Sequence, residues 1–355
     1  MTVPPGSTIG IIGGGQLGRM LSIAAAELGY RCHIFDPHQC PCAADVAAVH
    51  TRAAFDDQAA LRRFADSVDV ATYEFENVPV APLAALGDKL RPGAQSLAVA
   101  QDRAGEKEFI ERCGAHVPPW RAVASLDEVQ GALAALGAPL VLKTRRYGYD
   151  GKGQAWVRDA ADAAAAWDAI GGEPAVAEAG IDFLAEFSVI LARWADGPHT
   201  FWDSPENTHR DGILRHSSVP GGAIVAEQQA EARAAALAIA EALGHVGVLT
   251  VEFFAVADGP LVNEIAPRVH NSGHWTIEGA LTSQFAQHIR AICGLPSGST
   301  ALTGAGAAMD NLIGRDVGDW PQVIADPTAH LHIYGKGEAR PGRKMGHVTR
   351  VRVRG

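Results

Sequence analysis

Hydrophobic and polar positions along the first part of the chain alternate between buried-strand runs and helical patterns. Residues 8–18 read TIGIIGGGQLG, which predicts a buried strand, a glycine turn and a helix from Gln16 to about Leu28. Residues 31–35 predict a second strand, and residues 60–76 predict a helix followed by a third strand with its core at 69–75. Strands and helices that alternate in this way predict a parallel sheet with helices on both faces.

The rest of the chain predicts further strands together with alanine-rich helices. A helix is expected at about 102–113, and residues 227–244 have the spacing of an amphipathic helix. Strand patterns occur at 140–146, 153–159, 175–194 and, on both sides of a basic glycine-bearing loop, within 330–355. These elements predict a fold of mixed α/β and α+β class, with a parallel-sheet unit first and a small β-rich unit last.

Size and charge limit the classes of protein to consider. At 355 residues the chain is long enough for two or three packed units. Its net charge of −10 argues against general nucleic-acid binding, but a local cationic pocket could still hold a small phosphorylated substrate. The sequence has no apolar run of membrane-spanning length, no signal-peptide pattern at its start, and an odd number of cysteines. We therefore expect a cytoplasmic protein that does not contact membranes.

The segment 248–275 carries the densest set of candidate site residues. Glu252 and Glu264 flank a turn at Asp258-Gly259. Two strands paired around a turn centred on Asp258 would bring these carboxylates face to face, whereas a register change of one residue would separate them. Adjacent carboxylates repel unless a cation lies between them, and Mg²⁺ held by one or two carboxylates usually accompanies a phosphate substrate. The alternative is a solvated hairpin with scattered acids.

A glycine turn follows the first predicted strand. Gly13, Gly15 and Gly18 form a G-x-G-x-x-G pattern, and Asp36 lies about twenty residues later. This is the spacing of a dinucleotide-binding turn, in which backbone N–H groups at a helix start hold a phosphate. Any phosphate would satisfy the same groups, and the glycines could also serve only to make a tight turn.

A second glycine-bearing loop follows the strand that ends near Lys143. Residues 143–154 read KTRRYGYDGKGQ, so a lysine charge is followed by glycines whose backbone N–H groups can surround phosphate oxygens. The pattern differs from a Walker A loop. Its glycines would let the loop close over a nucleotide. A solvated basic hairpin is the alternative.

Two weaker patterns accompany these loops. Glu76 and Asn77 follow the third predicted strand, at the sheet edge where open α/β folds bind ligands, although a capped strand end would look the same. Residues 178–181 and Glu186 belong to extended segments that could read an adenine edge through backbone groups and hold ribose hydroxyls with a carboxylate.

A basic cluster lies near the end of an otherwise acidic chain. Lys336, Arg343 and Lys344 occur within YGKGEARPGRKMGH. Cations on a glycine-bearing loop suit a substrate phosphate. A solubilising surface loop is the alternative.

Taken together, these motifs resemble the ATP-grasp superfamily and, within it, the N5-carboxyaminoimidazole ribonucleotide synthetases of purine biosynthesis. The glutamate pair and the second glycine loop are common to ATP-grasp enzymes, whereas the runs APRVHNSGHWT and RPGRKMGH are much narrower. The similarity covers almost the whole chain. It implies an ATP-grasp fold with a Rossmann-like unit at 1–95, an ATP-grasp region at 96–295 with a lid at about 120–180, and a small C-terminal unit at 296–355.

The resemblance also implies a reaction. Its substrates would be ATP, bicarbonate and 5-aminoimidazole ribonucleotide, and its products the N5-carbamate, ADP and phosphate, with carboxyphosphate as intermediate. Mg²⁺ is implied as cofactor and a homodimer as the assembly. The chain departs from many relatives at Lys152, where they carry arginine, and in stopping soon after GHVTRVRV, where they continue into a helix. Lysine keeps the charge but loses the bidentate fork of arginine.

Residues that match the family's functional positions fall into three groups. The implied metal ligands are Glu252 and Glu264. The implied ATP-binding residues are Arg103, Lys143, Gly148, Tyr149, Asp150, Gly151, Lys152, Gly153, Gln154, Glu178, Ala179, Gly180, Ile181, Glu186, His209, Asn263 and Glu264. The implied ribonucleotide and bicarbonate residues are Gln16, Leu17, Glu76, Tyr149, Asp150, Arg268, His270, Asn271, Ser272, Lys336 and Arg343. The catalytic roles are expected at Asp150, Lys152, Arg268 and His270.

Other functions account for part of the pattern. A nicotinamide-dependent oxidoreductase would explain the first glycine turn but leaves the second loop, the carboxylate pair and the basic cluster without a role. Another ATP-grasp ligase, such as the formate-dependent glycinamide ribonucleotide transformylase or a biotin carboxylase, would share the nucleotide and metal residues and differ at 268–275 and 336–347. A noncatalytic protein with this fold is disfavoured because both predicted metal carboxylates are present.

Overall fold

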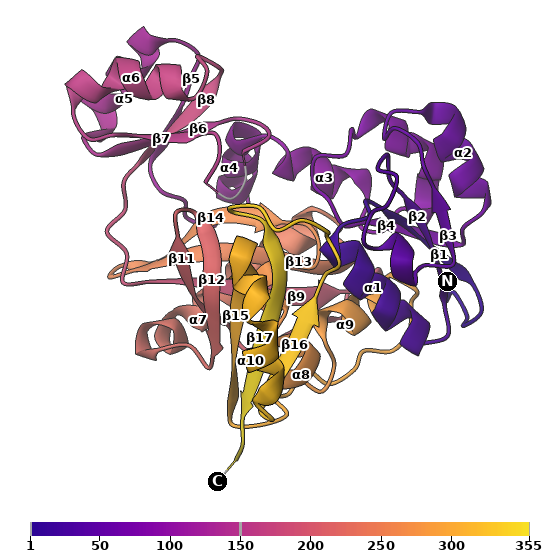
Figure 1. Cartoon of the computed structure of the whole chain (residues 1–355). Helices are drawn as coiled ribbons and strands as arrows, with labels where there is room; N and C mark the ends of the chain where they lie inside the picture. Colours follow the sequence, from indigo (N-terminus) through magenta and orange to yellow (C-terminus); the bar gives the residue numbers. More distant parts are fainter. Residues whose placement is uncertain (1, 149–150, 355) are drawn as a thin grey trace.

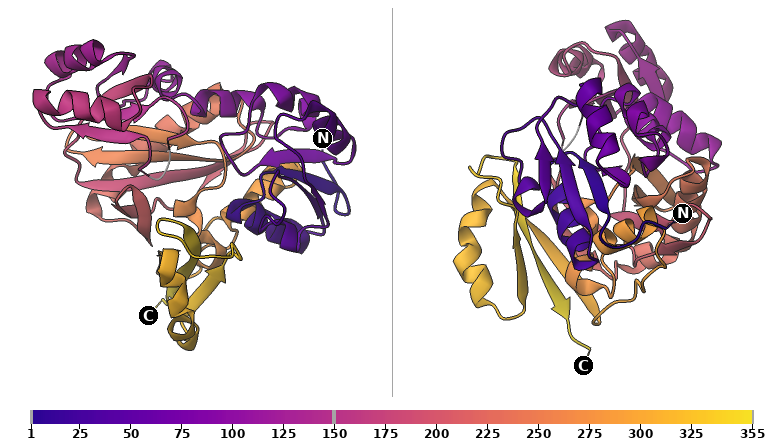
Figure 2. Two further views of the ribbon diagram at one scale, coloured as in Figure 1. Left: turned by 45° about the horizontal axis from the view of Figure 1, so that its top comes forward. Right: turned by 90° about the vertical axis from the view of Figure 1, so that its right-hand side faces the viewer.

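Three β-sheets organise the chain in the computed structural model, which describes residues 2–148 and 151–354 (Figure 1). A four-stranded sheet lies near the N-terminus, a second one lies within residues 120–179, and a nine-stranded sheet lies between them in space. Figure 2 shows the two smaller sheets as separate lobes on either side of the central sheet, with the C-terminal strands at a third corner. Within the described residues, none of the helices combines the length and the apolar character needed to span a membrane.

The N-terminal sheet is parallel, with strand order β3-β2-β1-β4. Its strands are β1 (Thr8–Ile12), β2 (Arg31–Phe35), β3 (Val49–Thr51) and β4 (Val70–Tyr73), and its covering helices are α1 (Gln16–Glu27) and α2 (Gln58–Asp66). The strand predicted as the third is therefore the fourth. The edge strand β3 has only three residues and none of them is buried, so it lacks the apolar run by which a strand is predicted.

The second sheet is antiparallel, with strand order β5-β8-β6-β7. It consists of β5 (Trp120–Val123), β6 (Leu140–Thr144), β7 (Gln154–Val157) and β8 (Ala175–Ala179), and it packs on α5 (Leu126–Leu136) and α6 (Ala163–Ala169). Strands β6 and β7 form a hairpin in which Lys143 pairs with Gln154. The predicted glycine loop is the connection of this hairpin.

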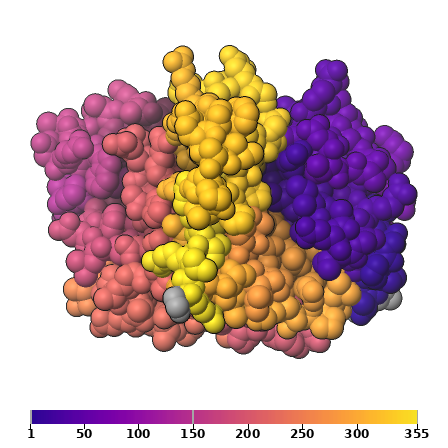
Figure 3. Space-filling model, turned by 60° about the horizontal axis from the view of Figure 1, so that its bottom comes forward, coloured from indigo at the N-terminus to yellow at the C-terminus, as the bar shows by residue number. Residues whose placement is uncertain are grey.

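The central sheet has the order β14-β13-β9-β11-β12-β15-β17-β16, and β10 pairs with β9. Its strands are β9 (Ala185–Arg193), β10 (His199–Phe201), β11 (Glu206–Arg210), β12 (Ile213–Val219), β13 (Gly247–Val256), β14 (Gly259–Ala266), β15 (Gly306–Ile313), β16 (Ala329–Ile333) and β17 (Lys344–Arg352). Strand β15, which was not predicted, pairs with both β12 and β17. The C-terminal strands therefore extend the central sheet, and Figure 3 shows the yellow C-terminal residues between the indigo N-terminal unit and the salmon residues opposite.

Helices on the faces of the sheets hold the units together. The remaining α-helices are α3 (Ala94–Ala100), α4 (Arg103–Arg112), α7 (Ala223–Ala242), α8 (Thr276–Gly279), α9 (Gln284–Ile292) and α10 (Trp320–Ala325). Helix α4 begins where predicted because the Asp102 carboxylate accepts hydrogen bonds from two backbone N–H groups of its first turn. Helices α1 and α9 share one core, in which Leu17 and Leu21 are buried together with Phe285 and Ile289. This core fixes the N-terminal unit against the central sheet.

Candidate active site

Glu252 and Glu264 form a cross-strand pair in the β13–β14 hairpin, as predicted. The turn is not centred on Asp258, however, because Val256 pairs with Gly259 and the two-residue turn is Ala257-Asp258. A bulge between positions 252 and 253 of β13 shifts the register, so that β14 contains one extra residue, Asn263. Bulges redirect side chains, and here Asn263 and Glu264 both line the same cavity.

The two glutamates differ in their electrostatic surroundings. Burial, and then the neighbouring carboxylate of Glu264, raises the pKa of Glu252 to about 7. Burial also acts on Glu264, but the cations of Arg103 and Lys143 outweigh it and lower its pKa. Arg103 Nη1 lies 3.0 Å from Glu264 Oε2. A carboxylate pair that resists full ionisation is the donor set expected where a divalent cation completes the charge balance.

The oxygen atoms of Glu252, Glu264 and Asn263 suit Mg²⁺, which keeps some of its ligands from substrate and water, better than a metal that is held by protein ligands alone. The described residues contain no group of three or more histidine, cysteine, aspartate or glutamate side chains placed to hold one ion. Two carboxylates with the Asn263 amide nearby would leave several coordination positions for phosphate oxygens and water, as Mg²⁺ prefers. Glu252 and Glu264 are the residues that would hold it.

His270 lies beside this pair in a defined tautomer. The Ser272 backbone N–H donates to His270 Nδ1 at 3.3 Å, so the ring proton is on Nε2, which faces Glu252 Oε1 at 3.2 Å. Burial, and then the Arg268 cation, holds the pKa of His270 well below its usual range. The imidazole is therefore neutral, and its Nε2 proton lies on the side of Glu252.

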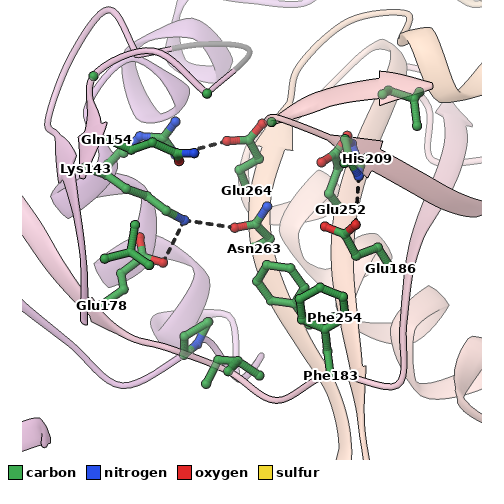
Figure 4. A pocket seen from close by; sticks show the side chains of 18 of the residues that line it. Lys143, Gln154, Glu178, Phe183, Glu186, His209, Glu252, Phe254, Asn263 and Glu264 are labelled. Carbon is green, nitrogen blue, oxygen red and sulfur yellow. Dashed lines mark hydrogen bonds and ion pairs between the residues drawn. The ribbon is translucent and has the colours of Figure 1, made fainter. Parts of the chain in front are cut away.

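The cavity above the hairpin has a volume of about 410 Å³ and is the site where the predicted nucleotide residues meet (Figure 4). Lys143 projects into it from β6, and its Nζ lies 2.9 Å from Glu178 Oε2 and 3.2 Å from Asn263 Oδ1. The Glu178 carboxylate is thus engaged by Lys143, so residues 178–181 would face a base through their backbone, and Glu186 is the other carboxylate of this predicted group that lines the cavity.

The far wall of this cavity combines a polar pair with two aromatic rings. His209 Nδ1 lies 2.9 Å from Glu186 Oε2, and this contact, with Glu252 nearby, outweighs burial and raises the pKa of His209. Phe183 and Phe254 stack with their ring centroids 4.9 Å apart. Neither Phe183 nor Phe254 was predicted as a site residue. An apolar wall next to hydrogen-bonding groups suits a purine base with its ribose.

A second cavity, of about 750 Å³, adjoins the first on the side of the N-terminal unit. The predicted substrate residues that line it are Gln16, Leu17, Glu76, Arg268, His270, Asn271, Lys336 and Arg343. The two cavities share Arg103, Lys152, Glu264, His270, Asn271 and Lys344. Arg268 Nη2 lies 3.0 Å from Glu76 Oε1, which joins the segment after β14 to the N-terminal unit. Burial is the main reason that the pKa of Lys336 falls to about 8.

The first glycine turn is not a dinucleotide site. Glu74 accepts hydrogen bonds from the N–H groups of Gly15 at 2.8 Å and Gly18 at 3.2 Å, so a carboxylate of the protein occupies the position of a phosphate. A Cβ at position 15 would lie 2.8 Å from Glu74 Oε1, which explains glycine there. Asp36 accepts from the Gly14 N–H at 2.8 Å and is buried. These contacts remove the basis of the oxidoreductase interpretation.

Most other predicted residues lie around the two cavities. Gly148 lines the second, and Gly151, Lys152, Gly153 and Gln154 line the first. Ser272 is fully buried behind His270 and lines neither cavity. Tyr149 and Asp150 lie outside the described residues. Sequence reasoning missed Glu106 and Lys107, which are buried acidic and basic residues on the face of α4 that contains Arg103.

Family models match the chain in three consecutive parts. An ATP-grasp domain matches residues 108–285, a ribonucleotide synthetase preATP-grasp domain matches residues 6–101, and a phosphoribosylaminoimidazole carboxylase C-terminal domain matches residues 307–353. The matches follow the order of the predicted units.

Relatives are similar over nearly their full length. The N5-carboxyaminoimidazole ribonucleotide synthase of Brucella melitensis biotype 1 is 49% identical, with 99% of this chain and 98% of that one covered. The enzyme of the same name from Pseudomonas aeruginosa is 46% identical, with 96% and 93% covered.

Solved structures agree with these sequence matches. A crystal structure of the ADP complex of an N5-carboxyaminoimidazole ribonucleotide synthetase superimposes with a TM-score of 0.94 at 43% identity, covering 99% of this chain and 93% of that one. The Aspergillus clavatus synthase in complex with ADP and 5-aminoimidazole ribonucleotide gives a TM-score of 0.91 at 30% identity, with 98% and 94% covered. The predicted ATP-grasp fold is confirmed, and the chain belongs to the N5-carboxyaminoimidazole ribonucleotide synthase family of ATP-grasp ligases.

Proposed function

We propose that the protein carboxylates 5-aminoimidazole ribonucleotide with bicarbonate, at the cost of ATP, to give N5-carboxyaminoimidazole ribonucleotide, ADP and phosphate. The observation that carries this proposal is the contact between two cavities of different character, which share six residues. One has the carboxylate pair and Lys143 for a nucleotide, and the other has Lys336 and Arg343 for a second, phosphorylated substrate. Their junction is where a phosphorylated intermediate could pass from one to the other.

The chemistry at the junction needs mainly positioning and charge neutralisation. A bicarbonate oxygen attacks the γ-phosphorus, the bond to the β–γ bridging oxygen breaks, and ADP leaves as carboxyphosphate forms. The C–O bond of carboxyphosphate then breaks to release phosphate and carbon dioxide. The exocyclic amine of the ribonucleotide bonds to this carbon and loses a proton.

The residues of the chain have distinct tasks in this scheme. Lys143, Gly148 and residues 151–154 hold the phosphates, and His270 at the junction orients bicarbonate together with Arg268 of the second cavity. Lys336 and Arg343 hold the ribonucleotide. We further propose Mg²⁺ at Glu252 and Glu264, where the bound cation would neutralise phosphate charge. Tyr149 and Asp150 stay predictions as substrate ligands.

Phosphate release from ATP tests the proposal. The protein is assayed with Mg²⁺ and bicarbonate, with and without 5-aminoimidazole ribonucleotide, at neutral to mildly basic pH. We expect strong stimulation by the ribonucleotide. Stimulation by glycinamide ribonucleotide with formate instead would identify another ATP-grasp ligase and overturn the proposal. Light scattering on the purified protein tests the homodimer, which, like the cytoplasmic location, stays a prediction.

A further inference from the structure

Lys107 is a buried cation behind the nucleotide cavity that the scheme above does not use. Its side chain is 1% exposed, it extends from α4, and it does not line the cavity. Its Nζ lies 3.2 Å from Glu178 Oε1, in an ion pair that is not aligned as a hydrogen bond. Lys143 Nζ occupies the other oxygen of the same carboxylate at 2.9 Å.

One carboxylate is therefore shared by two ammonium groups. Burial would raise the pKa of Glu178, but Lys143 and then Lys107 lower it to about 2, so the carboxylate is ionised. Lys143 also lies 3.2 Å from the neutral amide oxygen of Asn263, and its charge acts on Glu264. Glu178, Lys143 and Lys107 sum to one positive charge, and Lys143 is the cation of the three that lines the cavity (Figure 4).

A buried ion pair is costly to form, because both charges lose water and their attraction only partly offsets this loss. An apolar side chain at position 107 would fill the same space without that cost. The cation at this position therefore needs an explanation other than packing. If Lys107 were absent, Glu178 would neutralise Lys143 one to one, and the cavity would lose its attraction for an anion at this point.

We infer that Lys107 is a positioning residue that neutralises Glu178 and so leaves the charge of Lys143 for the phosphates of the nucleotide. The inference rests on the proposed function, in which the cavity above the hairpin binds ATP. Lys107 acts through Glu178 and Lys143 and touches no substrate itself. The position of Lys107 agrees with an indirect role, because α4 places Arg103 on the cavity and Lys107 one turn further on, behind it.

Equilibrium binding of ADP to two variants tests the inference. Lys107→Met leaves Glu178 and Lys143 with no net charge, and we expect the Kd for ADP to rise about tenfold. The double variant Lys107→Met with Glu178→Gln restores one positive charge, because Lys143 stands alone. We expect its Kd for ADP to return to within about threefold of wild type. Adenosine, which has no phosphate, should bind all three proteins with similar affinity.

A packing role for Lys107 predicts the opposite pattern. The double variant would then bind ADP as weakly as the single variant or more weakly, and adenosine binding would fall in parallel. Either result would overturn the inference. Lys89→Met is the matched control, since it removes one lysine that donates only to the backbone carbonyls of Ala65 and Val68.

Two further readouts separate the inference from the function on which it rests. Failure of the wild-type protein to bind ADP would reject the nucleotide site itself. Wild-type binding with an unchanged Kd for Lys107→Met would reject only the role of Lys107. In turnover, Lys107→Met should raise the KM for ATP more than it lowers kcat. Thermal unfolding confirms that each variant is folded before binding is measured.

Discussion

Glu252 and Glu264 face each other across the β13–β14 hairpin because Asn263 is an extra residue in β14. Without that bulge, the two-residue turn at 257–258 would place Glu252 opposite Asn263 instead. The bulge therefore creates the carboxylate pair and at the same time directs the Asn263 amide toward Lys143. The register of the β13–β14 hairpin thus determines which side chains are available to bind a cation at the site.

Replacement of Glu264 by alanine should abolish ATP turnover, with a loss of about a thousandfold or more, because the developing charge would lose its preorganised cation site. ADP binding measured without Mg²⁺ should persist, since the substitution removes a negative charge from an anion site. Phosphate release measures the turnover of ATP, and equilibrium binding measures the affinity for ADP. Glu231→Ala, an exposed glutamate near the hairpin turn, is the control. Turnover close to wild type would contradict the metal role.

Lys336 lines the second cavity, so its removal should affect the binding of the ribonucleotide. Lys336→Ala should raise the KM for the ribonucleotide and leave the KM for ATP nearly unchanged. Equal loss of ATP affinity in Lys336→Ala and Glu264→Ala would contradict the division of the site into two cavities.

The ribonucleotide affinity of the wild type should depend on pH. Burial lowers the pKa of Lys336 to about 8, so the ammonium is present below this pH and is lost above it. Affinity for the anionic substrate should therefore fall as the pH rises through about 8. The KM for the ribonucleotide measured from pH 7 to 9 checks this, and Lys336→Met should lack the alkaline loss.

Stability should fall in acid because two histidines are buried in the neutral form. Burial lowers the pKa of His245 to about 4 and that of His288 to about 3. The unfolded chain takes up these protons near the ordinary pKa of about 6.5. The stabilisation is thus complete above that pH and is lost as the pH falls toward 4. Urea unfolding at several pH values measures the decline.

A variant of His288 tests the origin of that acid sensitivity. His288 Nδ1 accepts from the Val248 N–H at 3.0 Å, so its Nε2 donates to Thr72 Oγ1 at 2.8 Å, which links α9 to the N-terminal sheet. His288→Gln should lose about 1–2 kcal/mol at pH 7.5 through weakened hydrogen bonds. Its stability should also decline less between pH 6.5 and 4. A slope equal to that of the wild type would contradict the assignment.

Glu74 should be required for the structure of the first glycine turn. Glu74→Ala leaves the N–H groups of Gly15 and Gly18 without their acceptor, which should cost about 2–4 kcal/mol of unfolding free energy. Gln16 and Leu17 follow this turn, so the KM for the ribonucleotide should rise as well. Chemical denaturation and steady-state kinetics provide the measurements, with exposed Glu27→Ala as control. Unchanged stability would show that the turn does not depend on this carboxylate.

Patterns confined to one element were predicted well. The start of α1 at Gln16, the span of β2 and the position of α4 at about 102–113 all follow from local patterns. The carboxylate pair was also predicted, but from a turn centre that was wrong by half a residue. A bulge of one residue, which leaves no local signature in the sequence, compensated for this error.

Contacts between distant segments were not predictable in the same way. The glycine turn matched a dinucleotide pattern, and only the fold shows that Glu74, 56 residues beyond Gly18, fills its anion position. Lys107 and Glu106 look in the sequence like solvated charges of a helix, and their burial depends on β8 and β14. Strand β15 lies between β12 and β17 and was missed. The unit boundaries near residues 95 and 295 stay predictions.

The buried face of α4 determines which substitutions in this helix should affect activity. Arg103, Glu106 and Lys107 recur at helical spacing and contact Glu264, the Ile265 N–H and Glu178. The opposite face bears the exposed residues Glu108, Glu111 and Arg112. In a saturation library, activity should therefore vary with the period of the helix, and a single inserted residue within α4 should displace Arg103, Glu106 and Lys107 from their partners together.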